Sequence, residues 1–137
     1  MKKAGCIIFV GFLTCFVTTL AFAAPYMQEG LWEITSTVNM PGMSMPAGSF
    51  EQCITSQDLV PQNTQPGEEC SISNVRQKGD RVLWTLRCVT PNGKTEGSGQ
   101  ITYKGKTFSG EMQIEMIGQQ GMQIKILMEG RRIGDCP

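Results

Sequence analysis

The chain has 137 residues, with 12 basic side chains, 12 acidic side chains and no histidine. This length is typical of a single domain. The balanced charge provides no basic patch, so we expect no binding to nucleic acid. Without histidine the chain lacks the commonest general base and metal ligand, so we expect a protein that is not an enzyme and carries no cofactor.

The first 23 residues have the three parts of a secretory signal peptide: two lysines, an uncharged apolar run, and the small-x-small pattern Ala21-Phe22-Ala23. We expect cleavage after Ala23, because a cut one residue later would place Pro25 directly after the scissile bond. No later stretch is long and apolar enough to span a bilayer. Residues 24–137 are therefore predicted to form a single exported domain, periplasmic or secreted, with no stable membrane span after cleavage.

The first predicted strand covers residues 30–40, where apolar residues such as Trp32 alternate with polar ones. Residues 39–48, rich in proline, glycine and methionine, are expected to form a loop. Two uses of Met40, Met43 and Met45 remain open. Their thioethers could bind the soft ions Cu(I) or Ag(I), or they could form an apolar flap over one end of the fold. We favour the flap, because Met40 has the inward parity of its strand and its sulfur would be buried.

Residues 55–69 show no strand period, and we expect a loop there with one short helical turn beginning near Ser56. Runs with a period of two then follow, separated by short turns that contain glycine. The apolar positions of these runs are Val82, Trp84, Leu86 and Cys88; Ile101 and Tyr103; Phe108, Met112, Ile114 and Met116; and Met122, Ile124, Ile126 and Met128.

This pattern predicts an all-β fold, a single antiparallel meander in which each strand pairs with the next. No amphipathic helix is long enough to cover the apolar face, so we expect the sheet to curl into a small barrel or half-barrel. Gly97 and Gly99 share the face of Ile101, where they leave room for a tryptophan ring.

Four cysteines follow the predicted signal peptide: Cys53, Cys70, Cys88 and Cys136. An even number in an exported domain predicts two disulfides, and no two of them form the C-x-x-C pair of a zinc site. A hairpin with a three-residue loop at 78–80 places Cys70 opposite Cys88, whereas a two-residue loop would shift this register by one. Cys53 is then left to pair with Cys136.

Several short motifs occur in a characteristic order: GLWEITSTVNMPGMSMP at the start, QCIT, VLWTLRC, the glycine-rich GSGQITYKGKTFSGEM, and GRRIGDC at the end. In this order they resemble the exported bacterial domain-of-unknown-function 3617 family over essentially all of residues 24–137. The resemblance implies export and a single domain. The family brings no established activity, cofactor or catalytic residue.

The alternating apolar face fits either a filled core or a pocket for an apolar ligand, and methionine-rich walls adapt to varied shapes. We predict a non-catalytic binding protein that holds an apolar small molecule or an envelope protein. The alternatives are a Cu(I)- or Ag(I)-handling protein that uses Met40, Met43 and Met45, and a structural or interaction module. The candidate ligand-binding residues are Trp32, Trp84, Tyr103, Phe108, Met112, Met116, Met122 and Met128.

Overall fold

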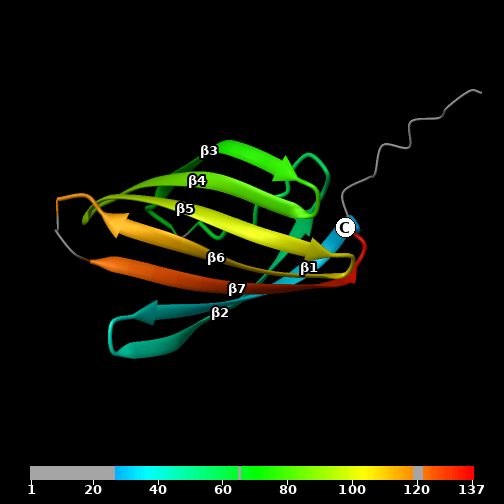
Figure 1. Ribbon diagram of the computed structural model, residues 1–137, viewed down its shortest axis with the longest axis horizontal. Coiled ribbons are helices and arrows are strands. Elements are labelled where there is room, and N and C mark those ends of the chain that lie inside the picture. The colour runs from blue at the N-terminus through cyan, green and yellow to red at the C-terminus, as the bar shows by residue number, and fades with distance from the viewer. Residues whose placement is uncertain (1–26, 65, 119–121) are drawn as a thin grey trace, which may run out of the picture.

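The computed structural model describes residues 27–137, except residue 65 and residues 119–121 (Figure 1). The predicted signal peptide and its cleavage site lie outside the described residues. No helix that could cross a membrane occurs in the part of the chain that the structure describes.

The described residues form seven strands and no helix. All seven strands belong to one antiparallel sheet, in the order β2-β1-β7-β6-β5-β4-β3. The strands are β1 (Gly30–Met40), β2 (Met43–Ile54), β3 (Glu69–Lys78), β4 (Arg81–Thr90), β5 (Gly93–Lys104), β6 (Thr107–Met116) and β7 (Gln123–Gly134).

The expected meander is correct from β3 to β7 and wrong between β2 and β3. The first hairpin joins the sheet through β1, which pairs with the last strand, β7. This leaves β2 and β3 as the two edges, and within the described residues no ladder joins them, so the sheet is open. Figure 1 shows the β1–β2 hairpin extending to the lower left, away from β3. The prediction failed because the segment between β2 and β3 is too long for a hairpin turn, and strand order then depends on long-range pairing.

Alternation along the strands gives the sheet one apolar face, which carries Trp32, Trp84 and Met128 and is called here the concave face. Cross-strand neighbours on it include Met112 beside Ile126 and Ile114 beside Ile124. Burial is complete near the β5–β6 turn and decreases toward the β6–β7 connection, where these side chains are half-buried. The concave face is therefore sealed at one end and open at the other.

Gly99 makes room for a tryptophan ring, as the sequence predicts. It lies directly opposite Trp84, and a Cβ built on Gly99 would lie 2.2 Å from a ring carbon of Trp84. Gly130 has the same relation to Phe108, with 2.1 Å between the added Cβ and the ring. Glycine at these positions lets each ring lie flat over the neighbouring strand.

The two disulfides are Cys53–Cys136 and Cys70–Cys88, with Cα–Cα distances of 5.4 and 4.0 Å. These are the two predicted pairs, but the predicted three-residue loop between β3 and β4 is wrong. Lys78 pairs with Arg81, so the turn has two residues, and a bulge between Ser73 and Arg76 restores the register that brings Cys70 opposite Cys88.

Asn74 occupies this bulge. Its φ of 52° lies in the left-handed region, which asparagine tolerates better than most side chains. The Asn74 side-chain amide donates a hydrogen bond of 3.0 Å to the Thr85 hydroxyl on β4. This hydrogen bond stabilises the bulge, whose extra residue brings Cys70 opposite Cys88.

The part of the β2–β3 connection that contains Leu59 and Val60 closes one end of the concave face. The predicted helical turn near Ser56 is absent: instead, the backbones of Thr55 and Asp58 exchange hydrogen bonds of 3.1 and 3.3 Å. After this turn Leu59 and Val60 are buried in the core. The Tyr103 hydroxyl donates a 2.7 Å hydrogen bond to the Leu59 carbonyl, which fixes the segment against the sheet.

The methionine segment is not the expected loop or flap. Residues 39–48 belong to β1, β2 and the two-residue turn between them, and Gly42 supplies the positive φ of 81° that this turn requires. Met43 and Met45 are 57% and 39% exposed, and Met40 is only half-buried. The flap prediction is wrong because strand pairing continues to the turn and holds these methionines at the end of an extended hairpin.

Candidate ligand-binding site

Three of the expected ligand-binding residues form a closed aromatic cluster. Trp32, Tyr103 and Phe108 have ring centroids 5.4–5.7 Å apart, and their exposed fractions are 0%, 2% and 3%. The indole N–H of Trp32 donates to the Gln28 carbonyl at 3.2 Å. Burial, and to a smaller extent the Asp58 charge, raise the pKa of Tyr103 far above its usual range. The structure places these rings in the sealed end of the sheet, packed on one another.

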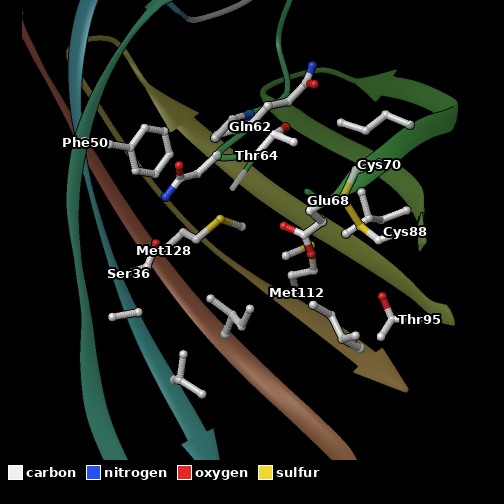
Figure 2. Close-up of a pocket in the computed structure, with 18 of the residues that line it drawn as sticks. Ser36, Phe50, Gln62, Thr64, Glu68, Cys70, Cys88, Thr95, Met112 and Met128 are labelled. Carbon is white, nitrogen blue, oxygen red and sulfur yellow. A yellow bond between two sulfur atoms is a disulfide. The ribbon is translucent and has the colours of Figure 1, made fainter. Parts of the chain in front are cut away.

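A cavity of about 270 Å³ lies beside this cluster, over the concave face. Figure 2 shows Phe50 on one side of the cavity and the Cys70–Cys88 disulfide on the other, with Met128 and Met112 between them. Residues from both edges of the sheet thus line one space. Its apolar lining is Val38, Ala47, Phe50, Pro61, Ile72, Trp84, Leu86, Met112, Ile114, Ile126 and Met128.

The polar part of the lining is concentrated in the segment before β3. Gln62, Asn63, Thr64 and Glu68 come from this segment, whereas the sheet contributes only Ser36 and Thr95 as polar side chains. The Gln62 backbone N–H donates to the Gln52 side-chain oxygen on β2 at 2.8 Å, which positions the rim. Gln62 and Thr64 lie along one side of the cavity in Figure 2. The cavity therefore has an apolar wall and a polar rim.

The sequence-predicted ligand-binding residues are divided between different places. Trp84, Met112 and Met128 line the cavity. Met116 is half-buried further along β6 and Met122 is 47% exposed, and neither belongs to the lining. The division follows from position along the strands. Met112 and Met128 lie in the middle of β6 and β7, whereas Met116 and Met122 lie at the β6–β7 connection, beyond the cavity.

Sequence reasoning missed several lining residues. Ile72 and Leu86 stand opposite each other in the hairpin that carries Cys70 and Cys88, so strand parity could have identified them. Phe50 lies opposite Ile34, and pairing of residues 43–54 with the first strand would have placed it on the same face. Gln62, Asn63, Thr64 and Glu68 come from a segment with no periodic signal, and only the folded chain brings them to the cavity.

Two groups of atoms deserve consideration as metal ligands. A carboxylate oxygen of Glu68 and the sulfur atoms of Cys70 and Cys88 lie within 4.8 Å of one another. Because the two sulfurs are bonded to each other, neither is a thiolate that could bind a metal. The second group is Met40, Met43 and Met45. These share one face because Met40 is paired with Met43 and Val38 with Met45.

A family model for proteins of unknown function, DUF3617, matches residues 27–136 of the chain. Neither the curated proteins nor the solved structures gave a match.

Proposed function

We propose that this chain, which belongs to the DUF3617 family of proteins of unknown function, is an exported, non-catalytic protein that binds an apolar small molecule. In this proposal the curled sheet acts as a half-barrel, and the cavity over its concave face is the binding site. The observation that carries the proposal is a cavity of about 270 Å³ whose wall is apolar and whose rim is polar.

The size and chemistry of the cavity support a small ligand. Ligand pockets occupy roughly 300–1,000 Å³ and combine an apolar lining with a few polar groups, and this cavity, at about 270 Å³, lies just below that range. Ile114, Ile126 and Met112 in its wall are half-buried, so a ligand would remove further apolar surface from water. The Met112 and Met128 side chains can adjust to the shape of the ligand.

The two disulfides support the exported location. Disulfides persist in oxidising compartments and in secreted proteins, and they are rare where thiols are kept reduced. Cys53–Cys136 joins positions 83 residues apart in sequence, and Cys70–Cys88 joins the edge strand β3 to its neighbour β4. Mature protein purified from a periplasmic or secreted fraction should begin at Ala24 and contain no free thiol, which intact mass and thiol labelling can measure.

The binding site can be tested with an apolar dye whose fluorescence rises in a dry environment. The oxidised protein should bind the dye at about one site. Met112→Arg places a charge in the apolar wall, and we expect it to weaken dye binding at least about tenfold, because an unpaired charge is costly in an apolar site. Gln113→Arg adds the same charge at an exposed position on the opposite face and serves as the control.

A second variant distinguishes loss of the binding site from misfolding of the Met112→Arg protein. Thr95→Phe fills the cavity from β5 without adding a charge, and it should also weaken dye binding while both disulfides remain intact. If both cavity variants bind the dye as the wild type does, the cavity is not the site. If the wild-type protein binds no apolar probe, a structural or interaction module becomes the better description.

The methionines at the end of the β1–β2 hairpin support a second candidate, the handling of Cu(I) or Ag(I). Pairing of Met40 with Met43, and of Val38 with Met45, places three thioethers on one face. Met40 is half-buried and Met43 is exposed, so neither side chain is enclosed in the core, and thioether sulfur is a ligand that these soft ions prefer. Titration with Cu(I) against a competing chelator tests this function: submicromolar binding that is lost on changing all three to leucine would establish it, with dye binding unchanged.

A further inference from the structure

The charge of the cavity lining is negative. Among the lining residues that the structure describes, Glu68 is charged and none is a lysine or an arginine. Figure 2 shows the Glu68 carboxylate directed into the middle of the cavity, between the disulfide and Met112. Glu68 is half-buried, in contrast to the exposed Gln62 and Thr64 at the rim. Glu68 also has an interaction partner within the chain, and it supplies the negative charge of the lining.

The position of this carboxylate divides the cavity into a polar side and an apolar side. Glu68 and the rim residues come from the segment before β3, while the opposite wall consists of side chains from β6 and β7 such as Met112, Ile126 and Met128. A ligand that satisfies both sides has a polar head next to Glu68 and an apolar body against the sheet. The cavity is therefore matched to an amphiphile more closely than to a plain hydrocarbon.

A half-buried carboxylate selects the charge of that head. Coulomb interactions are stronger near low-dielectric surfaces than in bulk water, and a hydrogen bond from a cationic donor to a carboxylate is about twice as strong as a neutral one. A carboxylate head would instead be repelled by Glu68 and would find no cationic side chain in the described lining.

We infer that the ligand of this cavity is a small amphiphile with a protonated amine as its head and an aliphatic body, and that Glu68 is the residue that selects it over a fatty acid. This inference rests on the proposed apolar binding function, and it adds the chemical class of the ligand. Glu68 is not expected to hold the aliphatic body, which contacts the wall formed by β6 and β7.

The contribution of the head group can be measured with three ligands that differ only at that end of an aliphatic chain: decylammonium, decanol and decanoate. Each is used below its micelle concentration. For the wild-type protein we expect decylammonium to bind at least about tenfold more tightly than decanoate, the ratio that one charge-assisted hydrogen bond supplies. Glu68→Gln should remove most of this ratio while leaving the affinity for decanol within about twofold. Isothermal calorimetry or dye displacement measures the three dissociation constants.

Glu69→Gln is the matched control, because Glu69 is the next residue, is exposed, and does not line the cavity. It removes the same charge and should leave the ratio unchanged. The inference is overturned if decylammonium and decanoate bind equally to the wild type, or if Glu69→Gln lowers the ratio as much as Glu68→Gln. Failure of decanol to bind would refute the proposed apolar function, whereas decanol binding without a charge preference would refute only the role of Glu68.

Discussion

Single side chains determine how the sealed end of this protein is built. Trp84 lies over Gly99 and Phe108 lies over Gly130, so two bulky rings depend on two residues that lack a Cβ. Tyr103 contributes both a buried ring and a hydroxyl that reaches the Leu59 carbonyl. Each contact joins different parts of the chain, so a change of a few atoms affects how strands and the covering segment fit together.

Gly99→Ala should destabilise the protein by about 1–3 kcal/mol. The added Cβ would lie 2.2 Å from the Trp84 ring, so the ring must shift within a packed core. Urea unfolding followed by tryptophan fluorescence measures the change. Gly134→Ala is the control, because a Cβ there meets no atom within 4 Å. Equal stability of the Gly99→Ala protein and the wild type would show that the ring is not held against β5.

Tyr103→Phe should lower the free energy of unfolding by about 1–3 kcal/mol near neutral pH, because it leaves the Leu59 carbonyl without its buried donor. Chemical denaturation at a fixed pH measures this loss. The substitution keeps the ring and its contacts with Trp32 and Phe108, so the difference reports the hydroxyl. No change in stability would mean that water satisfies the carbonyl in the variant.

Tyr103 also predicts a dependence of stability on alkaline pH. Its pKa in the folded protein lies above the ordinary value of 10.0, so the native state retains a proton that the unfolded state releases. Its contribution is complete below pH 10 and is lost as the pH rises further. We expect the wild type to lose more stability above pH 10 than the Tyr103→Phe variant does. Parallel curves for the two proteins would contradict a buried, protonated tyrosine.

At the scale of elements, the β3–β4 hairpin combines a short turn with a bulge. The two-residue turn by itself would offset Cys70 from Cys88, and the bulge that contains Asn74 corrects the offset. The segment between β2 and β3 then continues from the first hairpin and closes the concave face with Leu59 and Val60. The turn and the bulge together therefore decide whether the edge strand β3 can form a disulfide with β4.

The two disulfides should contribute unequally to stability. By the chain-entropy estimate, a bond that closes 83 residues is worth about 4.5 kcal/mol and one that closes 18 residues about 3 kcal/mol. Replacing Cys53 and Cys136 together by alanine should therefore destabilise the protein more than replacing Cys70 and Cys88. Thermal or urea unfolding of the two double variants measures both values, and the reverse order would contradict the entropic account.

At the scale of the whole molecule, burial changes along the sheet. The end that contains Trp32 and Tyr103 is fully buried, whereas the β1–β2 hairpin end exposes Met43 and Met45. Between these ends lies the cavity, where apolar side chains are half-buried. In the proposed function, the buried end would serve as the stable framework on which the cavity-lining residues are placed.

Amide hydrogen exchange should follow this gradient. The backbone amides of hydrogen-bonded residues around Ile34 and Tyr103 should exchange at least roughly a hundredfold more slowly than those of residues 43–48, because local opening of an exposed edge needs less free energy than opening of the core. Exchange monitored by mass spectrometry of short peptides measures the difference. Uniform protection along the chain would show instead that the hairpin end is as stable as the core.

The sequence by itself determined most of the strands, the face that each of these buries, and the pairing of the four cysteines, whereas β2 was expected to begin as a loop. These features depend on local rules: side chains alternate with a period of two along a strand, and turn residues fix the ends of hairpins. Even the room left by Gly99 for Trp84 could be read from strand parity. The predicted hairpin gave the correct cysteine pairs although its loop was one residue too long, because a bulge compensated for the difference.

Only the tertiary structure decided that β1 pairs with β7, that the aromatic rings Trp32, Tyr103 and Phe108 pack closely together, and that a cavity remains beside them. It also brought Glu68 from a segment without any period into the lining of that cavity. These features depend on contacts between residues far apart in the chain. Loop closure over such distances costs entropy that no local pattern encodes, and the packing of all strands together decides which contacts repay it.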